Sequence, residues 1–267
     1  NNMTARAMRL AALMLAATAI LGLLLLSNHA YSWWLQVREP VTNLHLGWGL
    51  LGWAGILVAG VAFQVVPMFQ LTPAFPAPMT RWLAIILFLL LLALSLGVAV
   101  PVLRLPAGMA LSGSLAWFAI TTLRLQSQRR RKLPDVTLSF WRGGMLCLLL
   151  AIALWLAGQF FPLGGNGKYE LLLGLLMIVG FAMSLVNGML YKIAPFLVWF
   201  HLQSRRKPGD PVAPNVKQIL PEIRTRRQMW LHFAALASLI AAVLQPALFA
   251  YPAAVLSGAS SLWLWLN

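Results

Sequence analysis

Acidic residues and cysteine are the side chains that this sequence has least of. Its 267 residues include five Asp and Glu, and its one cysteine, Cys147, lies in an apolar run. A single cysteine excludes an intramolecular disulfide, a cysteine-based metal cluster and covalent haem attachment through a Cys-x-x-Cys-His motif. The acidic residues fall in expected loops or at expected helix ends. That placement argues against a carrier built on a midplane carboxylate and against carboxylate-based hydrolysis.

Charged residues of both signs are scarce, whereas apolar residues are abundant. Only 9% of the residues are charged and 61% are hydrophobic, and the mean hydropathy is +0.81. A soluble domain has about 25% charged residues, most of them on its surface. The composition therefore excludes an ordinary soluble domain and predicts an integral membrane protein whose main partner is the lipid bilayer.

Eight apolar stretches are long enough to cross a bilayer, whose hydrocarbon core takes about 20 residues of helix. We expect an all-α, polytopic membrane helix bundle of about eight transmembrane helices in a single membrane domain, residues 1–267. The first stretch exceeds the roughly 7 to 15 apolar residues of a signal peptide, so we expect a retained helix. The expected spans are 10–26, 44–68, 82–103, 107–125, 140–161, 171–198, 230–248 and 252–266.

Basic residues outnumber acidic residues by 20 to 5. In a soluble protein this excess would suggest nucleic acid, but in a membrane protein basic residues flank the spans on the cytoplasmic side. We therefore expect no nucleic-acid partner. If the N-terminus is cytoplasmic, only three of the 20 basic residues lie outside, Arg38, Arg104 and Lys168. This asymmetry predicts an inner (cytoplasmic) membrane protein with both termini in the cytoplasm.

The stretch 45–69 recurs at 173–197. A shift of 128 positions aligns glycines with glycines and a proline with a proline, and the matched pairs are Gly52/Gly180, Ala54/Ala182, Leu57/Leu185, Val58/Val186, Gly60/Gly188 and Pro67/Pro195. This pattern predicts an internal duplication, with repeat 1 at about 8–125 and repeat 2 at about 139–267. Each repeat would hold four helices, and an even number gives both repeats the same orientation, so they would be parallel repeats.

One face of the second expected helix carries a histidine followed by glycines. At 100° per residue, His45, Gly49, Gly52 and Gly60 share this face. Small residues at this spacing allow another helix to approach closely. A smooth groove below a histidine would equally accommodate a flat porphyrin with the imidazole as its axial ligand. The sequence leaves both interpretations open.

The four histidines are the candidate metal ligands. The expected topology places His29 and His45 near the outer surface and His201 and His232 near the inner one. Two pairs at opposite faces would suit two bis-histidine haems. Histidines at helix ends also serve as interfacial hydrogen-bonding groups, so the spacing alone does not decide between these roles.

The second span resembles helix two of the haem-copper oxidase subunit I superfamily, and the related helix of NnrS-like nitric-oxide-response membrane proteins. The resemblance rests on His45, the Gly-Trp pairs that follow, a Gly-x-x-aromatic step from Gly60 to Phe63 and the terminal Pro67, together with the four-helix repeat. It implies that His45 is a low-spin ligand of haem b, with copper as a further candidate cofactor. It also implies a role in respiratory or nitric-oxide-related metabolism.

The chain departs from that superfamily at helix six, where Leu173 stands opposite His45 and the copper-binding histidines have no counterpart. We therefore assign no catalytic residue and expect no terminal-oxidase activity from this chain alone. A second haem ligand would come from His29, a methionine or another chain. The alternative is a permease-like protein, or an accessory or assembly subunit of a respiratory membrane complex without a bound metal. A larger respiratory complex or a homo-oligomer is the candidate protein partner.

Overall fold

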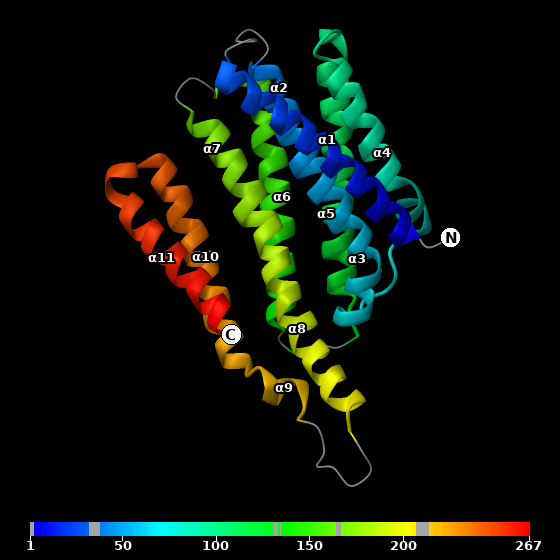
Figure 1. Ribbon diagram of the computed structural model, residues 1–267, viewed down its shortest axis with the longest axis vertical. Helices are drawn as coiled ribbons and strands as arrows, with labels where there is room; N and C mark the ends of the chain where they lie inside the picture. Colours follow the sequence, from blue (N-terminus) through cyan, green and yellow to red (C-terminus); the bar gives the residue numbers. More distant parts are fainter. Residues whose placement is uncertain (1–2, 32–37, 131–132, 134, 164–166, 207–213) are drawn as a thin grey trace. The chain divides into compact units, whose positions relative to one another are not determined.

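The computed structural model describes residues 3–31, 38–130, 133, 135–163, 167–206 and 214–267. All regular secondary structure in this part of the chain is helical (Figure 1). It contains eight helices that are long and apolar enough to cross a membrane. The prediction of an all-α, multi-pass membrane protein is confirmed.

The chain divides into two compact units, residues 1–131 (unit 1) and 132–267 (unit 2). Each unit contains four of the candidate membrane spans. The division falls between the two predicted repeats, in the basic segment that joins them.

Unit 1 consists of seven helical segments in the described residues. They are α1 (Met3–Tyr31), α2 (Arg38–Leu46), a π-helical segment (Gly47–Ala54), α3 (Gly55–Gln70), α4 (Ala77–Leu96), a 3-10 turn (Pro101–Leu103) and α5 (Arg104–Ser127). The helix α2, the π-helical segment and α3 follow one another without a break and form one candidate span, Arg38–Gln70. Leu71 ends this span in the left-handed conformation, with φ of 53°.

Unit 2 also contains seven helical segments in the described residues. They are α6 (Val136–Phe160), α7 (Lys168–Leu175), a π-helical segment (Leu176–Met183), α8 (Ser184–Ser204), α9 (Val216–Ile219), α10 (Glu222–Leu244) and α11 (Pro246–Leu266). The helix α7, the π-helical segment and α8 again form one continuous candidate span, Lys168–Ser204. The helices α10 and α11 are joined at Gln245 and pack side by side (Figure 1).

Local chemistry explains several helix boundaries. The side chain of Asp135 caps α6 by accepting a hydrogen bond of 2.9 Å from the backbone N–H of Thr137. Pro246 occupies the first turn of α11, where its missing N–H costs no intrahelical bond. Asp135 is one of four described acidic residues, and the other three lie in the first turns of α2, α7 and α10. Negative charge there is favourable because helix N-termini carry positive partial charge.

Several expected span boundaries were wrong. The third span was expected at 82–103, but its helix is Ala77–Leu96 and ends before Pro101. The sixth and seventh spans were expected at 171–198 and 230–248, but α8 continues to Ser204 and α10 begins at Glu222, so the segment between them is shorter than expected. Residues 207–213 of that segment lie outside the described residues. Hydropathy locates the apolar centre of a helix, but it does not show that the apolar residues 97–103 leave the helix or how far polar turns extend one.

Glycines allow close contact between the first two spans of unit 1. A Cβ atom built on Gly60 would lie 2.5 Å from Cβ of Ala7, and one built on Gly52 would lie 3.3 Å from Cβ of Met14. Real Cβ atoms essentially never approach to 2.5 Å, so α1 can lie this close to the second span at Gly60 only because that residue is a glycine, and the 3.3 Å distance at Gly52 is tighter than most real contacts. This is the small-residue packing that membrane helices use.

Unit 2 has the same arrangement between α6 and its second span. A Cβ atom on Gly188 would lie 2.7 Å from Cβ of Phe140, and one on Gly180 would lie 2.7 Å from Cβ of Cys147. Phe140 and Cys147 are seven residues apart, as are Ala7 and Met14 in unit 1. The two π-helical segments start at residues 47 and 176, close to the 128-residue shift found in the sequence. These correspondences are what a duplication would produce, and the duplication itself stays a prediction.

Candidate functional site

His45 lies at the end of α2 with its imidazole against α1. Its Nδ1 atom is 3.0 Å from the backbone carbonyl oxygen of Thr18. A carbonyl oxygen can only accept, so Nδ1 carries the proton and donates, which leaves the lone pair on Nε2. Among the described residues no hydrogen-bond partner is found for Nε2. The side chain is half-buried, and this hydrogen bond holds its ring against α1.

This arrangement is the one that a metal-ligating histidine usually has. The ring nitrogen that does not bind metal donates to a carbonyl or carboxylate, which fixes the tautomer and aims the other nitrogen. Gly22 of α1 makes room for the ring, because a Cβ atom there would lie 3.1 Å from Cε1 of His45. The backbone of α1 therefore both anchors and accommodates His45.

The glycines that follow His45 face protein rather than an open groove. A Cβ atom on Gly49 would lie 3.1 Å from Cγ2 of Thr18, and one on Gly52 would lie 3.1 Å from a methyl group of Leu91. Gly60 packs on α1 as described above. At Gly49, Gly52 and Gly60 the structure shows close packing against α1 and α4, which is the first of the two interpretations that the sequence left open.

His29 does not lie beside His45. The imidazole of His45 touches α1 at Gly22, and His29 is seven residues further along the same helix. At 1.5 Å per residue this separates the two levels by about 10 Å. Within the described residues there is also no group of three or more His, Cys, Asp or Glu that could hold a metal ion.

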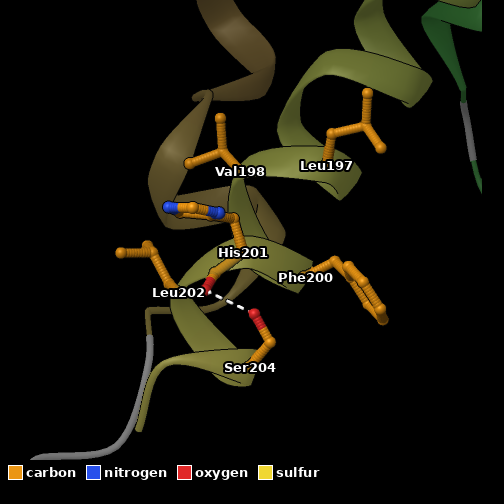
Figure 2. Close-up of a pocket in the computed structure, with 6 residues that line it drawn as sticks. All are labelled: Leu197, Val198, Phe200, His201, Leu202 and Ser204. Carbon is orange, nitrogen blue, oxygen red and sulfur yellow. Dashed lines mark hydrogen bonds between the residues drawn. The ribbon is translucent and has the colours of Figure 1, made fainter.

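The two inner-face histidines are not brought together either. His232 of α10 contacts Ser184, whereas His201 lies 17 residues beyond Ser184 on α8, about 25 Å along the helix axis. His201 lines an open surface pocket of about 510 Å³ at the end of α8. Figure 2 shows its ring among apolar side chains, and its carbonyl oxygen accepts a 2.9 Å hydrogen bond from Ser204. The expected pairing of His201 with His232 is therefore absent.

His232 is the most deeply buried histidine in the described residues. The sequence had instead predicted a position near the inner membrane surface. It is the eleventh of the 23 residues of α10 and is only 2% exposed. Its Nε2 lies 2.8 Å from Oγ of Ser184, and its Nδ1 lies 3.4 Å from the side-chain nitrogen of Asn187. The rings of Phe140 and Phe233 flank it, each with its centroid at 5.4 Å.

The hydrogen bonds assign one consistent arrangement of protons. The amide of Asn187 donates to Nδ1 of His232, so the proton of the neutral ring is on Nε2 and is donated to Ser184. The hydroxyl of Ser184 then donates to the carbonyl of Val179, at 3.4 Å, in the π-helical segment. In this arrangement every polar atom of the imidazole is satisfied. Ser184 and Asn187, three residues apart in an apolar span, were the signal in the sequence for a buried polar partner.

In comparisons with protein-family models, curated proteins and solved structures, nothing matches this chain. A function can therefore be inferred only from the chemistry of the sites at His45 and His232. In the part of the chain that the structure describes, Nε2 of the half-buried His45 has no hydrogen-bond partner, whereas both ring nitrogens of His232 are bonded in the interior of unit 2.

Proposed function

We propose that this chain is a haem-binding protein of the inner membrane and that Nε2 of His45 is an axial ligand of haem b. The observation that supports the proposal is the hydrogen bond from Nδ1 to the carbonyl of Thr18, which leaves Nε2 available. Haem is favoured over a copper centre built from side chains, because the porphyrin supplies four ligands itself. The described residues provide no cluster of three or more metal-ligating side chains.

The porphyrin would be held at the end of α2 rather than over Gly49, Gly52 and Gly60, because α1 packs on those glycines. The second axial ligand would be a methionine or a group from another chain, since His29 lies two helical turns from the level of His45. Bound haem supplies one-electron chemistry. The resemblance to haem-copper oxidase subunit I supports a role in respiratory or nitric-oxide-related metabolism within a larger complex or homo-oligomer. Both termini would be cytoplasmic.

The test is a reduced-minus-oxidised spectrum of the purified protein together with iron and copper analysis. Wild type is compared with His45→Ala and with the matched control His29→Ala, which removes an exposed histidine from α1. We expect a Soret band and iron in wild type, loss of both in His45→Ala and retention in His29→Ala. A wild-type protein without chromophore and without metal overturns the proposal.

A second candidate is a permease-like protein, or an accessory or assembly subunit of a respiratory complex without a bound metal. Two observations favour it. The glycine face is filled by α1, and the buried imidazole of His232 is satisfied by protein groups alone. Co-purification of a colourless protein with a larger respiratory complex from native membranes would support this candidate, whereas a His45-dependent chromophore would exclude it.

A further inference from the structure

The last turns of α8 carry the open surface pocket that contains His201, which the proposed function does not use. The pocket has a volume of about 510 Å³, and four of its six lining side chains are apolar. Those four are between 41% and 59% exposed, and they are Leu197, Val198, Phe200 and Leu202. The described residues therefore leave an apolar surface uncovered at this end of α8.

Two basic residues share one face of this helix end with two of the apolar ones. Val198, His201, Leu202 and Arg205 are spaced as i, i+3, i+4 and i+7, so they are neighbours on the helix surface. Arg205 directly follows α8, and its backbone angles are still helical. Figure 2 shows the ring of His201 on the same side of α8 as Val198 and Leu202. The face thus combines apolar side chains with basic groups that lie toward the end of the helix.

The described carboxylates of unit 2 do not neutralise this face. Asp135 is paired with Lys192 at 2.8 Å, and Glu222 is paired with Arg226 at 2.9 Å. The third described acidic residue of the unit lies in the first turn of α7, at the opposite end of the same span. Arg205 is exposed and forms no ion pair with any of these three. The face therefore keeps positive charge and is complementary to an anion.

The length of the span places this face at the level of lipid headgroups. The span Lys168–Ser204 has 37 residues, which corresponds to about 55 Å of helix. A bilayer is about 30 Å thick in its hydrocarbon core and about 40–45 Å with its headgroup layers. A helix of this length that crosses the bilayer carries its terminal turns into the headgroup layers. Phosphate groups and the first methylene groups of the acyl chains meet at that level.

We propose that the face formed by Val198, His201, Leu202 and Arg205 binds an anionic phospholipid. The guanidinium of Arg205 matches the geometry of a phosphate group, and an imidazole N–H of His201 can donate a further hydrogen bond. The acyl chains cover Val198 and Leu202 and remove them from water. Free phosphate would leave these apolar side chains exposed, and a zwitterionic headgroup carries its own cation, which competes with Arg205.

The experiment titrates lipid onto the purified protein in detergent and counts the bound lipids by native mass spectrometry. Phosphatidylglycerol is compared with phosphatidylcholine that has the same acyl chains. Arg205→Gln is compared with the matched control Arg9→Gln, which removes an exposed arginine from α1 of unit 1. We expect wild type to bind phosphatidylglycerol on the order of tenfold more tightly than phosphatidylcholine. Arg205→Gln should weaken that binding about fivefold, whereas Arg9→Gln should leave it unchanged.

Leu202→Gln tests the apolar part of the site. It leaves the charge unchanged and should weaken binding of phosphatidylglycerol about threefold, because the acyl chains lose an apolar contact. An unchanged unfolding temperature in lipid-free detergent reports an intact fold, and Leu202→Ala is read instead if Leu202→Gln lowers it.

Three results would overturn the proposal. Equal affinity of wild type for the two lipids would show that the headgroup charge is not recognised. Equal weakening by Arg205→Gln and Arg9→Gln would show attraction spread over the whole basic surface instead of a site. Displacement of the lipid by millimolar inorganic phosphate, with no effect of Leu202→Gln, would show a site for free phosphate.

Discussion

The Nε2 atom of His232 lies 2.8 Å from the hydroxyl oxygen of Ser184, so a polar bond joins α10 to α8 in the interior of unit 2. The partners are 48 residues apart in the sequence. Interhelical bonds of this kind contribute about 0.6 to 2 kcal/mol in membrane proteins, and their loss leaves a donor with no water to replace the partner. The bond therefore stabilises the packing of α10 on the span Lys168–Ser204.

Removing the Ser184 hydroxyl tests this bond. Ser184→Ala should lower the free energy of unfolding by about 1–3 kcal/mol, because the N–H of His232 stays buried without an acceptor. The measurement is reversible denaturant unfolding in mixed micelles. Ser114→Ala is the control, since the hydroxyl of Ser114 bonds only the carbonyl of Ala110 in its own helix. Equal stability of the two variants would show that the contact contributes nothing.

The close approach of α6 to the second span of unit 2 can be tested at two glycines. Gly188→Ala should destabilise the protein by about 1–3 kcal/mol, because the new methyl group would lie 2.7 Å from Cβ of Phe140. Gly174→Ala, in the same span, has no atom within 4 Å of the new methyl group. That variant should be neutral or slightly stabilising, by up to about 1 kcal/mol. A lower unfolding temperature for Gly174→Ala than for Gly188→Ala would contradict this packing.

Asp135 has two roles that substitutions can separate. Its Oδ1 caps α6, and its Oδ2 lies 2.8 Å from Nζ of Lys192 on α8. Both side chains are partly exposed, so we expect Asp135→Asn, which keeps the cap, to cost at most about 1 kcal/mol. Asp135→Ala removes the cap as well and should cost about 1 kcal/mol more. Both values come from unfolding titrations at low salt, and equal losses for Asn and Ala would assign the whole effect to the ion pair.

The orientation predicted from charge can be tested with a membrane-impermeant thiol reagent on intact cells. In a Cys147→Ala background, Val102→Cys should react, because residue 102 is 75% exposed and lies beside Arg104, which is expected outside. Ser127→Cys lies at the other end of α5 and should react only after the membrane is opened. The reverse pattern would place both termini outside the cytoplasm.

The candidate site could be predicted only in part. His45 was recognised because it precedes glycines on one face of an apolar span and because that span resembles helix two of haem-copper oxidase subunit I. The role of the following glycines stayed open, because it depends on which helix lies against them, and that helix, α1, contributes Ala7 from the far end of the unit's sequence. His232 was placed near the surface because its helix was expected to begin at residue 230, whereas it begins at Glu222.

Composition along the chain was enough to predict an all-α, multi-pass membrane protein, and the described residues contain eight candidate spans. The prediction succeeds because the transfer of apolar side chains into lipid depends on the composition of one segment at a time. Tertiary structure alone decided which polar groups are buried and what fills the glycine faces. Those outcomes depend on contacts between segments far apart in the chain, such as Ala7 with Gly60 and Ser184 with His232, and local composition carries no information about such pairs.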